Sequence, residues 1–262
     1  MKRVILACCL ATIFAFSANA QFGKSLKNVG KSVTKAVGDA AGDLAADAAA
    51  NKVAVNVTAW MDNNNNLAPS DSEYFTRLAS IVTPYVNVDG LEFNYHVYLS
   101  PEVNILACAD GSIRIYSGMM DILTDDEILA VIANQIGHIV NKDVRNSLMK
   151  VATGNNAENA TTAQLEKMLT LGGEKFGSVV NELIQIPYTI DQSKAADEYA
   201  VSFLKSNKKD AEALVSALEK FALLEENDRM AEADEEGTME ISFAAKYTKV
   251  NSNNATRASY IK

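Results

Sequence analysis

The chain has 262 residues, of which 48% are hydrophobic, so it contains enough apolar material for a compact domain and is not wholly disordered. Its formal net charge is −9, with 33 acidic against 24 basic side chains. This acidic balance argues against nucleic acid as a partner. We therefore expect a globular protein that acts on, or binds, another class of molecule.

The first twenty residues have the pattern of a secretory signal peptide. Two basic residues precede an apolar run at 4–16, and small residues end the segment. We expect cleavage after residue 20 and an exported protein, periplasmic or extracellular, with no transmembrane span in its mature part. An uncleaved anchor is disfavoured because the run is too short. A lipoprotein signal at Cys8 or Cys9 is disfavoured because little apolar sequence precedes either cysteine.

Residues 21–62 form a segment rich in alanine, glycine, valine and lysine. Apolar side chains recur every three or four residues from Phe22 to Val37, which predicts an amphipathic helix. We favour a helix lying on the domain or loosely tethered to it, because its small side chains make a weak apolar face. The alternative is a weak membrane-surface or partner contact through residues 22–50. The asparagine run at 62–66 predicts a linker, so we place the folded domain at 63–262.

Patterns within that domain predict helices and a few strands. Residues 91–99 alternate as a half-buried strand does, and Asp110-Gly111 joins two further apolar runs as a hairpin turn does. Capping-box spacing at 124–127 opens a buried helix. The expected elements, in order, are a helix at 71–84, strands at 91–99, 103–109 and 112–116, helices at 128–140, 161–185, 189–206 and 208–227, and a loop at 229–240.

Two side chains with reactive potential lie in these apolar strands. Cys108 is the only cysteine beyond the signal segment, and no basic group near it in sequence favours a thiolate. We expect a small buried residue there. His96 lies in an aromatic strand, where packing is expected rather than catalysis.

Two stretches carry the clearest functional signal. An apolar strand and a Gly-containing hairpin at 104–120 lead into a helix with Asn-Gln-x-x-His at 134–138, and a second helix carries Ser-Lys-Ala-Ala-Asp at 193–197. In this order and spacing the chain resembles metallopeptidase family 48, the HtpX-like and CAAX prenyl proteases, over roughly residues 70–205. The resemblance implies an α+β, predominantly helical zincin-like (gluzincin-type) domain with a small antiparallel sheet.

The resemblance also implies a role for each matching position. Asn134 stands where the family has its first zinc-binding histidine, and Gln135 stands where it has the general-base glutamate. His138 keeps the second histidine, whereas Ser193 replaces the glutamate ligand of the second helix. Asp197 matches the residue that orients the site without touching the metal. The region 246–258 lacks the histidine and proline of a further family element.

These substitutions predict a non-catalytic relative of the family. Carboxamides are poor ligands for zinc, and a glutamine side chain cannot take up a proton as a carboxylate does. The chain has only two histidines, His96 and His138, so no pair of histidines one helical turn apart exists. We therefore predict no cofactor. We expect His138 to be a hydrogen-bonded core residue, and the polar residues at these positions to bond one another across the two helices.

Three functions remain open from the sequence. The leading hypothesis is an exported pseudopeptidase that keeps a peptide-binding cleft and pairs a peptide or protein segment with an edge strand at 112–116, including Ile113 and Tyr116. A second is an active zinc metalloendopeptidase with atypical ligands such as His138, Asp197 or Glu198. A third is an envelope structural or assembly protein that works through residues 22–50.

Overall fold

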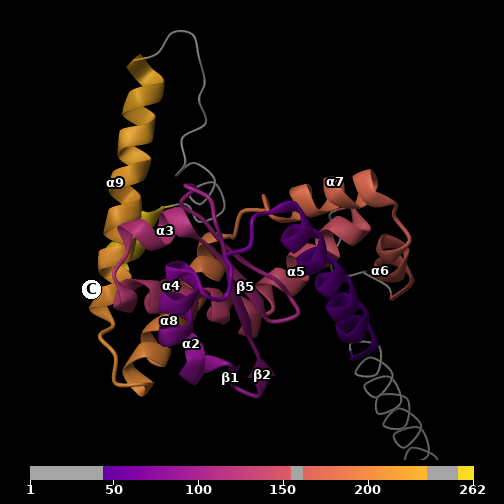
Figure 1. The fold of residues 1–262 in the computed structure, drawn as a ribbon, viewed down its shortest axis with the longest axis horizontal. Helices are drawn as coiled ribbons and strands as arrows, with labels where there is room; N and C mark the ends of the chain where they lie inside the picture. Colours follow the sequence, from indigo (N-terminus) through magenta and orange to yellow (C-terminus); the bar gives the residue numbers. More distant parts are fainter. Residues whose placement is uncertain (1–43, 155–161, 235–252) are drawn as a thin grey trace, which may run out of the picture. The chain divides into compact units, whose positions relative to one another are not determined.

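In the computed structural model, the described residues are 44–154, 162–234 and 253–262, and they form the α+β, predominantly helical fold that the sequence predicts (Figure 1). One compact unit extends from Ala45 to Lys262. No helix in these three ranges is long and apolar enough to cross a membrane. The expected signal peptide at 1–20 and the first part of the alanine-rich segment lie outside the described residues.

A three-stranded sheet lies between two groups of helices. Its strands are β3 (Asn94–Tyr98), β4 (Ile105–Ala107) and β5 (Ser112–Tyr116), in the spatial order β3-β5-β4. β4 and β5 form the expected antiparallel hairpin, but β3 runs parallel to β5, so the sheet is mixed rather than antiparallel. The predicted strand at 91–99 is divided, because β2 (Leu91–Glu92) pairs separately with β1 (Asn87–Val88).

The prediction that residues 112–116 form an edge strand is wrong. β5 has β3 on one side and β4 on the other, and Ile113 and Tyr116 are only 1% and 6% exposed. Chain order places β5 last, but the parallel pairing with β3 moves it to the centre of the sheet. Within the hairpin, the strand at the edge of the sheet is β4 instead.

One face of the sheet packs on a helical layer that contains the main core. Its central member is α4, which is almost entirely buried and begins at the predicted capping box of Thr124 and Glu127. α4 packs against both α8 and α9. The elements of this layer are α2 (Glu73–Val82), η1 (Thr83–Tyr85), α3 (Ser117–Ile122), α4 (Asp125–Val140), α8 (Ile190–Ser206), α9 (Glu212–Asp234) and α11 (Asn254–Ile261).

A second core lies against the other face. It contains buried residues of the helix at 44–64, β-strand side chains such as Leu106, and residues of α5 (Asp143–Thr153), α6 (Thr162–Leu169) and α7 (Gly173–Leu183). Figure 1 shows the indigo helix beside α5 and α7. The compact unit thus begins at Ala45 and includes nearly all of this helix.

Three expected element boundaries differ from the structure. The helix at 44–64 continues into the predicted asparagine linker, where Asn64 and Asn65 donate to the carbonyls of Trp60 and Met61 one turn earlier. The helix predicted at 161–185 is interrupted between α6 and α7. α9 extends to Asp234, into the stretch predicted to be a loop. In the first case, the hydrogen bonds of the asparagine side chains to helix carbonyls outweigh the weak polar breaker signal.

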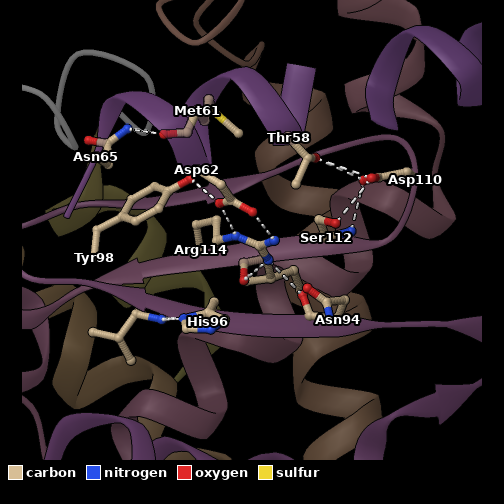
Figure 2. A network of polar contacts seen from close by, with 12 residues as sticks. Thr58, Met61, Asp62, Asn65, Asn94, His96, Tyr98, Asp110, Ser112 and Arg114 are labelled. Carbon is tan, nitrogen blue, oxygen red and sulfur yellow. Dashed lines mark hydrogen bonds and ion pairs between the residues drawn. The ribbon is translucent and has the colours of Figure 1, made fainter. Parts of the chain in front are cut away.

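Polar contacts fasten the helix at 44–64 to the sheet (Figure 2). Arg114 of β5 donates to both carboxylate oxygens of Asp62, at 2.8 and 2.9 Å. The hydroxyl of Tyr98 donates to the same carboxylate at 2.7 Å. Burial opposes ionisation of Asp62, but these bonds outweigh it and lower its pKa. Thr58 adds a bond to Asp110 in the β4–β5 turn. The helix is therefore tied to the sheet at two places.

Cys108 and His96 have the packing roles expected of them. Cys108 is buried, and burial raises the pKa of its thiol to about 12, so the reactive thiolate is scarce at neutral pH. The ring of His96 packs against that of Phe75, with centroids 5.1 Å apart.

The contacts of Glu127 on α4 with Ser216 and Lys220 on α9 are expected to weaken in acid. Burial opposes its charge, but bonds from Lys220, Ser216 and Thr124 lower its pKa from 4.5 to about 2. Because the folded-state pKa lies below the unfolded value, this stabilisation is complete above about pH 4.5 and is lost as the pH falls toward 2. The free energy of unfolding is measured in urea at several pH values from 7 to 2.5. At pH 7, Glu127→Gln will be less stable than the wild type by about 2 kcal/mol, because the bonds to the charged carboxylate are lost. Its stability will fall less than that of the wild type as the pH is lowered. Asp126→Asn, an exposed neighbour, is the control. Equal acid sensitivity of the Gln variant and the wild type would contradict the assignment.

Candidate functional site

The site is built where α4 and α8 pack together. α4 supplies Asn134, Gln135 and His138, and α8 supplies Ser193 and Asp197; all five side chains are buried. Gly137 permits the close approach of the two helices, because a Cβ there would lie 2.9 Å from the carbonyl oxygen of Ala196. The structure thus brings the two predicted motifs into one buried interface.

Asp197 is the centre of the polar network in this interface. It has no exposed surface, and Asn134 donates to one of its oxygens at 2.8 Å. Arg257 of α11 donates to both oxygens, at 2.9 and 2.7 Å, and the Tyr260 hydroxyl donates at 2.6 Å. A buried carboxylate with this many donors is fully compensated. The network therefore joins three helices through one side chain.

The carboxamides extend the network along α4. Gln135 donates to the side-chain oxygen of Asn134 at 3.1 Å, so Asn134 both accepts from Gln135 and donates to Asp197. This confirms part of the expected pairing. Ser193 is buried on the facing helix, but it takes no part in these two hydrogen bonds. The two bonds thus do not include every residue that the sequence predicts.

His138 is a fully buried, hydrogen-bonded core residue, as expected, but its partner is not Asp197. Its Nδ1 lies 2.8 Å from a carboxylate oxygen of Asp143, whose other oxygen accepts from Gln192 at 3.0 Å. Because a carboxylate accepts, Nδ1 carries the proton and Nε2 is left as an acceptor. Burial lowers the pKa of His138 despite Asp143, so the ring is neutral near pH 7. Tyr188 stacks on it at 3.7 Å.

These donors do not fit a zinc ion. A protein zinc site needs three or four imidazole, thiolate or carboxylate ligands. Among the described residues, no group of three or more such side chains lies close enough to hold a metal. Among the described residues of this site, Nε2 of His138 is the one suitable donor without a protein partner. Asn134 is already committed to Asp197, and Ser193 offers only a hydroxyl.

A mainly apolar pocket lies next to this network, at the outer edge of β4. Gln135 and Tyr188 line it together with Ile105 to Ala109, and further walls come from the helix at 44–64, from α5 and from the end of α7. β4 pairs with β5 through Leu106, so alternation directs the backbone groups of Ile105 and Ala107 away from β5. Asn104 already accepts from the Ile105 N–H at 2.9 Å. Ala107 is therefore the edge residue with both backbone groups available.

Sequence reasoning missed four residues of the site. Asp143 and Tyr188 flank the recognised motifs, and Arg257 and Tyr260 belong to the C-terminal helix. The sequence prediction for residues 246–258 concerned only the histidine and proline that this region lacks. A basic residue in an otherwise weakly charged helix, opposite a buried aspartate, is the signal that could have identified Arg257.

Comparisons with known proteins agree with the fold. The family model of peptidase family M48 matches residues 70–252. Metalloprotease LoiP of Escherichia coli (strain K12) is 34% identical over 177 residues, which cover 67% of this chain and 70% of that protein. Metalloprotease YcaL of the same organism is 31% identical over 172 residues, covering 64% and 66%. The chain thus spans about two thirds of each relative's length.

Removing the charge of Asp197 tests whether the network holds α11 in place. In Asp197→Asn, the buried ion pair between Asp197 and Arg257 is lost, which costs about 3 kcal/mol of unfolding free energy. We expect a lower midpoint in urea and faster proteolysis near α11. The exposed neighbour Glu198 provides a matched control, Glu198→Gln, with little change. An Asp197 variant as stable as this control would show that the network is dispensable.

Proposed function

The chain belongs to peptidase family M48, and from this premise we propose that it is an exported pseudopeptidase, which binds extended peptide segments without hydrolysing them. The observation that carries the proposal is the hydrogen bond from Asn134 to Asp197. Through this bond, the side chain at the family's first zinc-ligand position is used in a contact within the protein. Gln135, at the general-base position, is bonded to the same network and has no basic oxygen.

Active hydrolysis with atypical ligands has little support from the geometry. Asp197 accepts from three residues and is fully buried, so binding a metal would mean breaking its bonds to Arg257 and Tyr260. Glu198 follows it on α8 but is exposed, on another side of the helix from the buried network. His138 alone remains, and one imidazole does not make a zinc site.

Peptide binding is supported by the edge of β4 rather than by β5. Ala107 presents its N–H and C=O away from the sheet, and it is only partly buried. An extended segment paired there would form both hydrogen bonds of a β-bridge and would lie over the apolar pocket. The free strand edge and the neighbouring pocket thus offer backbone and side-chain recognition together.

Restoring the family residues tests the loss of metal binding. We expect the purified wild-type chain to hold no stoichiometric zinc, and Asn134→His/Gln135→Glu/Ser193→Glu to bind about one zinc ion per chain by elemental analysis, because three suitable ligands would then face one another. The same triple variant with His138→Ala is the control and will lose zinc. Zinc at one per chain in the wild type, with chelator-sensitive cleavage of casein, would overturn the proposal.

Removing one edge donor tests the peptide-binding mode. The probe is a fluorescein-labelled heptapeptide of alternating serine and threonine with one central leucine, measured by fluorescence anisotropy. Ala107→Pro deletes an N–H that β5 does not use, so the fold should persist while binding weakens about fivefold. Ala107→Gly keeps the donor and will retain binding. Equal affinity of the Pro and Gly variants would count against pairing at β4.

A further inference from the structure

The helix at 44–64 contributes to the pocket although it precedes the family-matched residues 70–252. Ala54 and Val57 from this helix line the pocket opposite residues of β4. They are 2% and 1% exposed. One wall of the cleft therefore comes from a segment outside the family match.

This wall is held in a fixed position. Thr58, next to Val57, donates to Asp110 at 3.2 Å, and that aspartate belongs to the turn that follows β4. One turn further along the helix, Asp62 forms its two-bond ion pair with the buried Arg114. Figure 2 shows both contacts on the same side of the helix. The position of the helix is thus fixed relative to the strand that would hold a peptide.

The size of the pocket limits what it admits. The pocket has a cavity volume of about 40 Å³, which is room for about three water molecules. Three or four carbon atoms fill a similar space, as in valine or leucine. Most of the lining is aliphatic and none of the lining residues is charged, so a charged side chain would lose its hydration without gaining an ion pair.

We propose that the helix at 44–64 determines which side chain the apolar pocket accepts. Ala54 and Val57 select one aliphatic side chain of an extended peptide that is bound along β4. The inference rests on the proposed peptide-binding function and goes beyond it by naming the class of side chain and the residues that select it. Ala54 and Val57 are specificity residues and have no part in holding the peptide backbone.

The test compares guest residues in one host peptide. Heptapeptides of alternating serine and threonine carry alanine, leucine, phenylalanine or aspartate at the centre, and their affinities are measured for the full chain. The wild type will prefer leucine. Ala54→Leu fills the pocket and will weaken leucine binding about tenfold while leaving the alanine guest nearly unchanged. Val57→Ala enlarges the pocket and will strengthen phenylalanine binding, a gain that a folding defect cannot produce.

Val55→Leu is the matched control, because Val55 is half-exposed on the same helix and does not line the pocket. It will keep the wild-type order of guests. If the wild type prefers leucine but neither Ala54→Leu nor Val57→Ala changes the order, the selecting role of the helix is overturned and peptide binding stands. If the wild type binds none of the guests, both proposals fail. Ala107→Pro separates the two effects, since it will weaken all guests alike.

Discussion

The buried carboxylate of Asp197 is the constraint on which the arrangement of the helices depends. A charge with no exposed surface must be compensated within the protein, and here an arginine, a tyrosine and an asparagine do so. These partners come from α4 and α11, whereas Asp197 belongs to α8. Any change that separates the helices would leave the carboxylate or the guanidinium buried without its partner. The C-terminal helix is therefore part of the site.

The same constraint explains how the site keeps its shape with carboxamides at two of the family's catalytic positions. A metal ion in a zincin-like site links ligands from two helices and is a strong cross-link between them. Hydrogen bonds from Gln135 to Asn134 and onward to Asp197 join the same helices without a metal. His138 lies outside this chain of bonds and is held instead by Asp143 and Tyr188. Polar side chains at the positions that match the family's ligands are thus compatible with a well-packed interface.

The apolar pocket and the polar network share the residue Gln135, which lines the one and donates a hydrogen bond within the other. The other side of the pocket belongs to the helix at 44–64, which the ion pair of Asp62 and Arg114 fastens to the sheet. Two layers that flank the sheet therefore meet at the β4 edge. A ligand there would contact both the family-matched domain and the segment before it.

The sequence by itself determined the family, the α+β class, the buried helix with its capping box and the polar residues at 134, 135, 138, 193 and 197. These features follow from local periodicity, capping and motif spacing, which short stretches of chain encode. Only the tertiary structure decided that β5 is central, because parallel pairing with β3 joins strands that are not neighbours along the chain. It also decided that Arg257 and Tyr260 compensate Asp197, a contact across about sixty residues that no local pattern records. Long-range pairing of strands and charges depends on how packed elements meet, and the sequence shows only what each element can offer.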